Sequence, residues 1–202
     1  MTQNLLNNDA ANLGSDATLL EIAAKPAVSL FPDSDHDSKR HGNDTLRPKF
    51  WSRYALSELN HSEWEALCDG CGSCCLIKYI DEDEHGDVAE ELVEYTDVTC
   101  QLMDCATGYC QHYATRQEHV PDCIQLTIEN LPQMMWLPSH CAYKRLYKGQ
   151  NLPSWHLLLT GNAVVTQQQM RAANVGVAGR CVSETGMSDE EMEMRVVTWV
   201  KP

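Results

Sequence analysis

The chain has 202 residues, of which 43% are hydrophobic and 22% charged, and its 15 Lys and Arg against 29 Asp and Glu give a formal net charge of -14. This composition is typical of a globular protein, and no apolar run approaches the roughly 18 to 20 residues that a membrane span needs. Because an acidic surplus repels phosphate backbones, we expect neither membrane spanning nor nucleic-acid binding. The first residues have no basic stretch followed by an apolar one, so we also expect no secretory signal and a cytoplasmic location.

The composition changes near residue 50. Residues 1–49 are rich in Asn, Asp and Ser, as in PDSDHDSKRHGND at 32–44. Such a segment buries too little apolar surface to offset the entropy of ordering the chain, which predicts a disordered polar N-terminal tail. A docking segment around Leu19–Ile22 is the alternative. Residues 50–202 are predicted to be the folded domain.

The first elements of the domain are predicted to be short. Residues 50–68 are expected to be helical, with Asn60 or Ser62 as an N-cap. LIKYI at 76–80 predicts a strand, and residues 88–98 return as a second strand or a helical turn. Our interpretation is a β-hairpin.

An acidic turn is predicted between these two strands. Nine carboxylates lie between Asp81 and Asp97, but they lack the spacing of a calcium loop, so we expect a solvated turn. Further along, Thr127–Leu131 is predicted to be a capped turn that Pro132 ends.

Two further helices are predicted toward the C-terminus. HCAYKRLYK at 140–148 is expected to be a short helix that Gly149 closes. Ser188 and Glu191 have the spacing of a capping box, and the apolar residues after them, through Trp199, recur at helical spacing. This pattern predicts a C-terminal amphipathic helix.

The densest feature of the sequence is CDGCGSCC at 68–75, which holds four of the ten cysteines. Two residues between thiols allow a tight turn to point both sulfurs at one ion, and Gly70 and Gly72 permit the backbone geometry that such a turn needs. A single C-x-x-C could equally be a redox dithiol, whereas two overlapping ones with intervening glycines favour metal ligation. In a chain without an export signal, clustered thiols are more often metal ligands than disulfides.

The adjacent residues Cys74 and Cys75 suggest more than one centre. Neighbouring side chains diverge in an extended backbone, so we expect one of the two to serve a second centre. Spacing alone does not tell which of the further thiols belong together: Cys100, Cys105, Cys110, Cys123 and Cys141.

Several motifs follow the cluster in a recognisable order: CQLMD at 100–104, CQHY at 110–113, VPDCIQLTIENL at 120–131, WLPSHCAY at 136–143 and WHLLLTG at 155–161. Together with CDGCGSCC they resemble the bacterial YcgN/YkgJ-type cysteine-cluster family, which is described as a "putative zinc- or iron-chelating" CxxCxxCC domain. The resemblance covers about residues 50–200. It implies zinc or iron binding and no further activity, because the family is itself largely uncharacterised.

The resemblance also implies a set of thiolate ligands, which divide naturally into two sets of four: Cys68, Cys71, Cys74, Cys75, Cys100, Cys110, Cys123 and Cys141. The family usually has another Cys where this chain has Gly108. Either the nearby Cys105 substitutes for that thiol or no ligand is needed there, and we favour the second. Cys181 lies outside the pattern and is expected to be a small buried hydrophobe.

Other candidate side chains are assigned structural roles. His112 and His140 stand beside cysteines but are expected to face solvent or to support ligands rather than to bind metal. His156 matches a family residue and could contact a ligand or hold its loop, and we favour the loop. The remaining aromatic candidates are expected to be core anchors: Trp64, Trp136, Trp155 and Trp199.

Three functions follow from these predictions. Thiolates suit zinc, mononuclear iron and iron–sulfur clusters, so the predicted cofactor is zinc or iron, with an iron–sulfur cluster as one form of the latter. The leading interpretation is a metal-binding protein; the alternatives are an iron–sulfur oxidoreductase or electron carrier, and a zinc-stapled adaptor for another protein. No catalytic motif is found and no catalytic residue is assigned. The predicted fold is a small, loop-rich α+β domain built around a cysteine metal centre.

Overall fold

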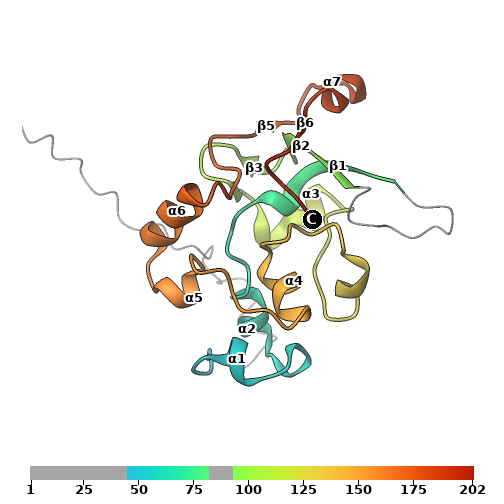
Figure 1. Ribbon diagram of the computed structural model, residues 1–202. Helices are drawn as coiled ribbons and strands as arrows, with labels where there is room; N and C mark the ends of the chain where they lie inside the picture. Colours follow the sequence, from blue (N-terminus) through green and yellow to red (C-terminus); the bar gives the residue numbers. More distant parts are fainter. Residues whose placement is uncertain (1–44, 82–92) are drawn as a thin grey trace, which may run out of the picture. The chain divides into compact units, whose positions relative to one another are not determined.

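The computed structural model describes residues 45–81 and 93–202. Residues 1–44 of the predicted tail and most of the predicted acidic turn lie outside the described residues. The described part has an α+β fold of short helices and strands joined by long loops (Figure 1). None of its helices is long and apolar enough to cross a membrane.

Three short helices make up the region expected to be helical over residues 50–68. They are α1 (Phe50–Arg53), the 3-10 helix η1 (Leu56–Glu58) and α2 (His61–Glu65). The backbone is extended on both sides of η1, with ψ 153 at Ala55 and ψ 136 at Leu59. The expected helical character of this range is therefore confirmed, and the extended residues divide it into three separate turns.

Asn60 begins α2 as the predicted N-cap. Its side chain accepts a hydrogen bond from the Glu63 N–H at 2.9 Å, and the Glu63 carboxylate accepts one from the Asn60 N–H at 3.2 Å, which is a capping box. Glu63 is fully buried, and its carboxylate also binds Arg47, whose Nε and Nη2 lie 2.8 and 2.6 Å from it. Arg47, from the stretch assigned to the tail, is thus joined to α2.

The main sheet has β2 at its centre. β1 (Leu76–Ile80) and β2 (Val93–Thr99) pair antiparallel, which confirms the two strands of the predicted hairpin. The other edge of β2 pairs in parallel with β5 (Val182–Ser183) and antiparallel with β6 (Val196–Val197). In Figure 1 this sheet lies at one end of the described domain and α1 and α2 lie at the other. Residues 66–75, the cysteine loop, run between them.

The predicted C-terminal helix is wrong beyond its first turns. Ser188 and Glu191 do form the capping box of α7 (Asp189–Glu193). The chain then joins the sheet, because β6 pairs with β2 and Arg195 binds Asp97 with Nε–Oδ1 and Nη2–Oδ2 distances of 2.7 and 2.8 Å. The edge of β2 is open for pairing, and Val196 and Val197 are β-branched residues that favour a strand, so this segment forms β6 despite the helical spacing of its apolar residues.

The other elements are short. β3 (Met103–Asp104) and β4 (Tyr109–Cys110) form a small antiparallel hairpin. The remaining helical elements are η2 (Ser73–Cys75), η4 (Tyr113–Thr115), α3 (Arg116–His119), η5 (Leu131–Gln133), α4 (Ala142–Tyr147), α5 (Leu157–Thr160) and α6 (Ala163–Ala172).

The structure tests the predicted capped turn at Thr127 and the predicted helix before Gly149. The turn at Thr127 is capped as expected, since the Asn130 side chain accepts the Thr127 N–H at 2.8 Å. Pro132 does not end this turn but lies inside η5, because proline is tolerated in the first turn of a helix. The helix predicted near residue 140 is α4, and Gly149 follows it with φ +69, as expected of a closing glycine.

One apolar core joins these elements. Its buried members come from α1, the loop after α2, both strands of the hairpin, the loop before α4 and the segment after α6, and include Phe50, Leu67, Leu76, Tyr95, Trp136, Leu137 and Val177. Trp136 is a buried core residue as predicted, and Trp64 and Trp199 pack against the core while partly exposed. Trp155 is half-buried and donates a hydrogen bond to Asp69. The core therefore lies directly beneath the cysteine loop.

Candidate metal centre

The cysteine loop leaves α2 and turns twice before β1 begins. Gly70 and Gly72 adopt positive φ, +70 and +72, which L side chains rarely adopt. A Cβ at Gly72 would lie 2.5 Å from the Val177 side chain and 2.9 Å from the Gly108 carbonyl oxygen. Glycine at this position is thus required both by the backbone conformation and by the close approach of two neighbouring segments.

Four thiols make up the first thiol group: Cys68, Cys71, Cys74 and Cys141. The Cys68 thiol interacts electrostatically with those of Cys74 and Cys141, although Cys141 lies far along the chain, just before α4. Burial, with smaller effects of Cys74 and Asp69, raises the pKa of Cys141 to about 12 and that of Cys71 well above its usual range. Buried thiols of this kind keep their protons unless a cation is present to stabilise the thiolates.

One carboxylate and one ammonium flank the first thiol group. Asp69 accepts the Cys71 N–H at 3.2 Å through Oδ1 and the Trp155 Nε1–H at 3.2 Å through Oδ2. Lys78 donates to the Cys74 carbonyl oxygen at 3.2 Å, and burial lowers the pKa of Lys78. Its Nζ also lies 4.3 Å from the centre of the Trp136 ring. The ammonium thereby offsets part of the negative charge that thiolates would bring to this place.

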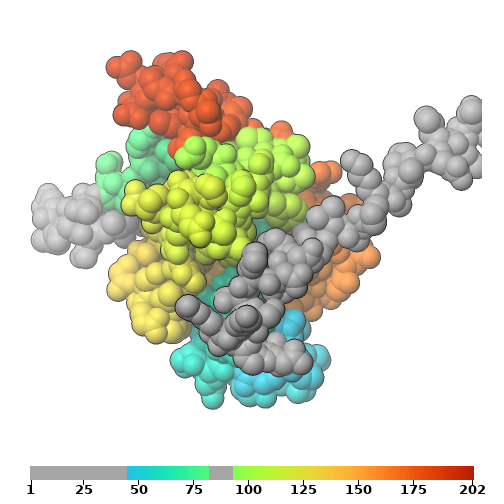
Figure 2. All heavy atoms as spheres, turned by 180° about the vertical axis from the view of Figure 1, so that it is seen from behind, coloured from blue at the N-terminus to red at the C-terminus, as the bar shows by residue number. Residues whose placement is uncertain are grey.

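The second thiol group consists of Cys75, Cys100, Cys110 and Cys123. The Cys100 N–H donates to the Cys75 carbonyl oxygen at 3.2 Å, and the β3–β4 register sets Cys110 opposite Met103, a few residues after Cys100. Cys123 interacts electrostatically with both Cys75 and Cys100. All four are half-buried. In Figure 2 the segment around residues 100–120, coloured yellow-green, lies at the surface on the side of the molecule shown there.

The adjacent residues Cys74 and Cys75 join the two groups. Their sulfur atoms lie only 3.9 Å apart, so the expectation that the side chains diverge is wrong. That expectation assumed an extended backbone, whereas both residues belong to η2. Two thiolates on one tetrahedral zinc lie about 3.8 Å apart, given Zn–S bonds of about 2.3 Å. The hydrogen bond between the two thiols lowers the pKa of Cys74 and raises that of Cys75.

The thiols are gathered but not arranged in a coordination shell. All ten cysteines are free, with no disulfide. Over residues 45–81 and 93–202, no three side chains of His, Cys, Asp or Glu converge closely enough to hold a metal ion. The donor set itself fits a soft metal, since each group offers four thiols and no competing hard ligand is needed. The eight ligand assignments therefore stay predictions.

Cys105 and Cys181 form a separate pair. Cys181 is 8% exposed and belongs to the apolar core, in agreement with the expected buried role. Burial, and then a hydrogen bond with the Cys105 thiol, raise the pKa of Cys181 to about 12. The Gly179 N–H also donates to the Cys105 carbonyl oxygen at 2.7 Å. Cys105 is thus engaged by Cys181, which favours the interpretation that it does not replace the family's missing thiol.

The histidines differ in their surroundings. His156 is fully buried, its Nδ1 accepts the Leu158 N–H at 3.1 Å and its Nε2 lies 3.0 Å from the Leu67 carbonyl oxygen. It therefore holds the loop that leads into Cys68. The Nε2 of His140 is buried and has no hydrogen-bond partner among the described residues. His112 is exposed, with its ring 4.6 Å from that of His119.

Sequence reasoning missed three residues around the first thiol group. Asp69 lies inside the motif itself, but nothing in the cysteine spacing marks it. Lys78 could have been found from the alternation of β1, because it shares a face with the buried Leu76. Tyr95, whose hydroxyl donates to the Trp136 carbonyl oxygen and interacts electrostatically with the thiols of Cys74 and Cys141, carries no signal in the sequence.

Comparison with known proteins supports the importance of this region. Residues 67–142 match a family model described as "CxxCxxCC: Putative zinc- or iron-chelating domain". This range includes all eight cysteines of the two thiol groups, and it excludes Cys181. The description supports the chelation of zinc or iron by this domain and names no further activity.

Relatives from several bacteria match most of the chain. A UPF0260 protein of Shewanella baltica is 43% identical over 150 residues, which are 74% of this chain and 94% of that protein. UPF0260 proteins of Shewanella pealeana and Parvibaculum lavamentivorans are 44% and 43% identical over 150 residues, again 74% of this chain, and 94% and 92% of their own lengths. No solved structure matches this chain.

Proposed function

Because the chain belongs to the UPF0260 family and its residues 67–142 match a domain described as zinc- or iron-chelating, we propose that it binds zinc or iron through the thiolates of the two thiol groups. The observation that carries the proposal is that thiols from distant loops lie close enough to interact electrostatically with one another. Cys141 reaches Cys68 and Cys74, and Cys123 reaches Cys75 and Cys100, yet no disulfide forms between any of them. Soft thiolate sets of this kind suit zinc and iron.

We assign the eight thiols to two centres of four that lie side by side, because the 3.9 Å between the Cys74 and Cys75 sulfur atoms is as short as the distance between two ligands of one ion. The first centre uses Cys68, Cys71, Cys74 and Cys141, and the second uses Cys75, Cys100, Cys110 and Cys123. The division follows most of the electrostatic interactions: Cys100 interacts with Cys110 and Cys123, and Cys71 interacts with Cys68 and Cys74. Cys75 interacts with Cys123 and also with Cys68 and Cys74, which makes it the link between the two centres. Four thiolates complete the coordination of a structural zinc or of a cysteine-bound iron, so each centre needs no further ligand.

In each centre the metal would replace thiol protons. The thiols of Cys71, which is buried, and Cys141, which is half-buried, hold their protons because of the raised pKa, so binding releases protons and gains strength as the pH rises. Lys78 supports the charge balance of the first centre, and the N–H of Cys71 remains bound to Asp69. We also propose a cytoplasmic location, because free thiols persist in a reducing compartment.

The test is elemental analysis and a visible spectrum of full-length protein purified without oxygen. We expect about two metal ions per chain if both centres are mononuclear. Zinc gives no visible absorbance, cysteine-bound iron gives a coloured protein, and acid-labile sulfide with broad absorbance would identify an iron–sulfur cluster. Protein that contains neither zinc nor iron, and takes up neither in the reduced state, would contradict the proposal.

Cysteine variants test the division. Cys141→Ser and Cys123→Ser should each lower the metal content by about half, because each removes one ligand from one centre. Cys181→Ser is the matched control, since it removes a buried thiol outside both groups and should leave the metal content unchanged. Equal metal loss in all three variants would contradict the ligand assignment.

A further inference from the structure

Two free thiols lie outside both thiol groups, and they contact each other. Cys105 is half-buried in the turn between β3 and β4, whereas Cys181 is buried, with 8% exposure, at the residue before β5. The two side chains share a hydrogen bond and interact electrostatically. Both pack in or against the apolar core. A pair of adjacent thiols to which no metal is assigned can carry two-electron redox chemistry.

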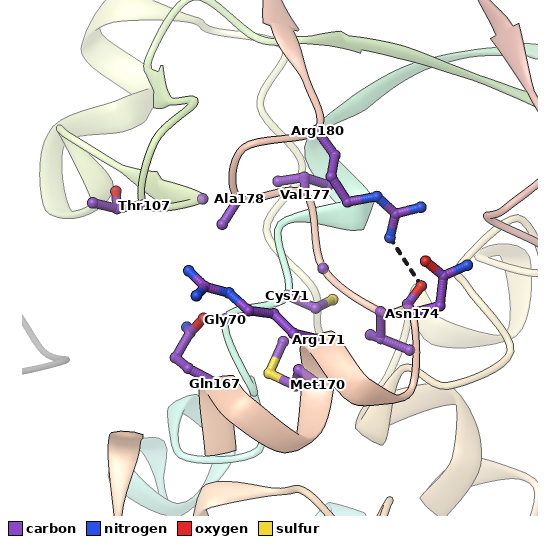
Figure 3. A pocket seen from close by; sticks show the side chains of 13 residues that line it. Gly70, Cys71, Thr107, Gln167, Met170, Arg171, Asn174, Val177, Ala178 and Arg180 are labelled. Carbon is purple, nitrogen blue, oxygen red and sulfur yellow. Dashed lines mark hydrogen bonds between the residues drawn. The ribbon is translucent and has the colours of Figure 1, made fainter. Parts of the chain in front are cut away.

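The backbones that carry the two thiols also meet. The Gly179 N–H, two residues before Cys181, donates to the Cys105 carbonyl oxygen at 2.7 Å. A Cβ at Gly108 would lie 3.3 Å from the Ala178 nitrogen, so the β3–β4 turn packs closely on the segment before β5. Both segments line a cavity of about 260 Å³, where Figure 3 shows Ala178 beside the turn. The contact between the thiols is thus supported by contacts between their backbones.

We propose that Cys105 and Cys181 form a redox site, at which a small hydroperoxide oxidises the two thiols to an intramolecular disulfide. The oxidant has to be small, because one thiol is half-buried and the other is buried. Thiols that already share a hydrogen bond need little movement of the chain to reach disulfide geometry. The proposal does not depend on the metal proposed above, because neither thiol is among the eight assigned ligands.

The reaction consumes two thiols and one hydroperoxide. The Cys105 sulfur, which is the more exposed, attacks an oxygen of hydrogen peroxide as a thiolate. The O–O bond breaks, the thiol proton and the released hydroxide form water, and Cys105 becomes a sulfenic acid. The Cys181 sulfur then attacks the Cys105 sulfur, the S–O bond breaks, and hydroxide leaves with the Cys181 proton as a second water. The products are one disulfide and two waters.

The disulfide would tie the β3–β4 turn to the main sheet. This turn separates Cys100 from Cys110, two ligands assigned to the second centre. Cys181 directly precedes β5, which pairs with the central strand β2. Oxidation would therefore fix the turn relative to β2 and leave the eight assigned ligands unmodified.

The test is oxidation of the full-length protein, as purified, with about one to ten equivalents of hydrogen peroxide, followed by blocking of free thiols and peptide mass spectrometry. Trypsin releases residues 181–195, whose one cysteine is Cys181, and chymotrypsin cleaves after Leu102 and Tyr109, which separates Cys105 from its neighbouring cysteines. We expect a linked pair of peptides that carry Cys105 and Cys181, and dithiothreitol should separate them.

Absence of this linked pair overturns the proposal, whether or not other cysteines are oxidised. A disulfide between Cys181 and any cysteine other than Cys105 overturns it as well. The metal content of each sample is measured in parallel, so that the result stands apart from that of the proposed metal binding.

Variants separate the two steps. Cys105→Ser should abolish the linked pair and leave Cys181 as a free thiol. Cys181→Ser should stop the reaction at the sulfenic acid of Cys105, which dimedone traps. Cys123→Ser is the matched control, because it removes another half-buried thiol and should retain the linked pair. An unmodified Cys105 in oxidised Cys181→Ser overturns the proposed first step.

Discussion

The two thiol groups are supported in different ways. The first ranges from the buried Cys71 to the exposed Cys68, and it lies against the apolar core, where His156 and Tyr95 fix the neighbouring backbone. The second consists of half-buried thiols, and its strand support is the two-residue pairing of β3 with β4. The comparison suggests that the first group is shaped by the protein core, whereas the second depends more on its own ligands for order.

The largest expected effect is that of metal removal. Chelation of the bound metal should lower the Tm by about 10 °C or more, because structural metal binding contributes directly to folding. Hydrogen exchange should increase most over residues 100–123 and least in β2, whose backbone is paired on both edges. A uniform increase along the domain would show that both groups depend equally on metal.

The next largest effect is expected from the loop glycine at the first group. Gly72→Ala should destabilise the fold by about 3 kcal/mol, because it adds a steric clash to the cost of positive φ. Gly149→Ala is the matched control: its φ is +69, and no atom lies within 4 Å of its Cβ position. It should cost only about 1 kcal/mol. Urea unfolding measures both, and equal losses would contradict the packing argument.

A smaller effect is expected from the helix that leads into the first group. Arg47 holds the pKa of Glu63 at about 2, below its usual value of 4.5. A depressed pKa stabilises the fold above the unfolded value, so this contribution is complete above about pH 4.5 and is lost as the pH falls toward 2. Glu63→Gln should therefore cost about 2 kcal/mol at pH 7, since it removes the charge from a partly exposed pair. The difference from the unmodified protein should shrink on acidification, and a pH-independent difference would contradict this account.

The smallest effect is expected at the sheet. Arg195 and Asp97 form a paired contact, but their side chains are 36% and 23% exposed. Solvent screens such a pair, so Asp97→Asn should cost about 0.5 kcal/mol, and added salt should reduce the difference further. Chemical unfolding at two salt concentrations provides the measurement. A loss as large as that of Glu63→Gln would mean that the attachment of β6 to β2 matters more than its exposure suggests.

Local patterns in the sequence predicted local structure well. The strands of the hairpin and the caps at Asn60 and Ser188 were predictable, since each depends on residues only a few positions apart. The C-terminal helix was not, because Val196 pairs with Thr96 of β2, a hundred residues earlier. Such long-range pairing leaves no mark on the spacing of the apolar residues.

The candidate site shows the same difference between local patterns, which the sequence reveals, and long-range contacts, which it does not. The cysteine motif predicted which thiols to consider, because its spacing is a local property of the chain. It could not predict that Cys141 lies near Cys68, or that Cys105 pairs with Cys181, since both depend on how the loops fold.

The contact between Cys74 and Cys75 has a consequence for the order in which the protein would take up metal ions. The two thiols share one hydrogen bond, which either sulfur can donate. An ion that binds one of these sulfurs as a thiolate removes this hydrogen bond, so the other thiol is freer to ionise for the neighbouring centre. Loading would then be cooperative, with the first ion promoting the uptake of the second, and partly filled molecules would be scarce during a titration.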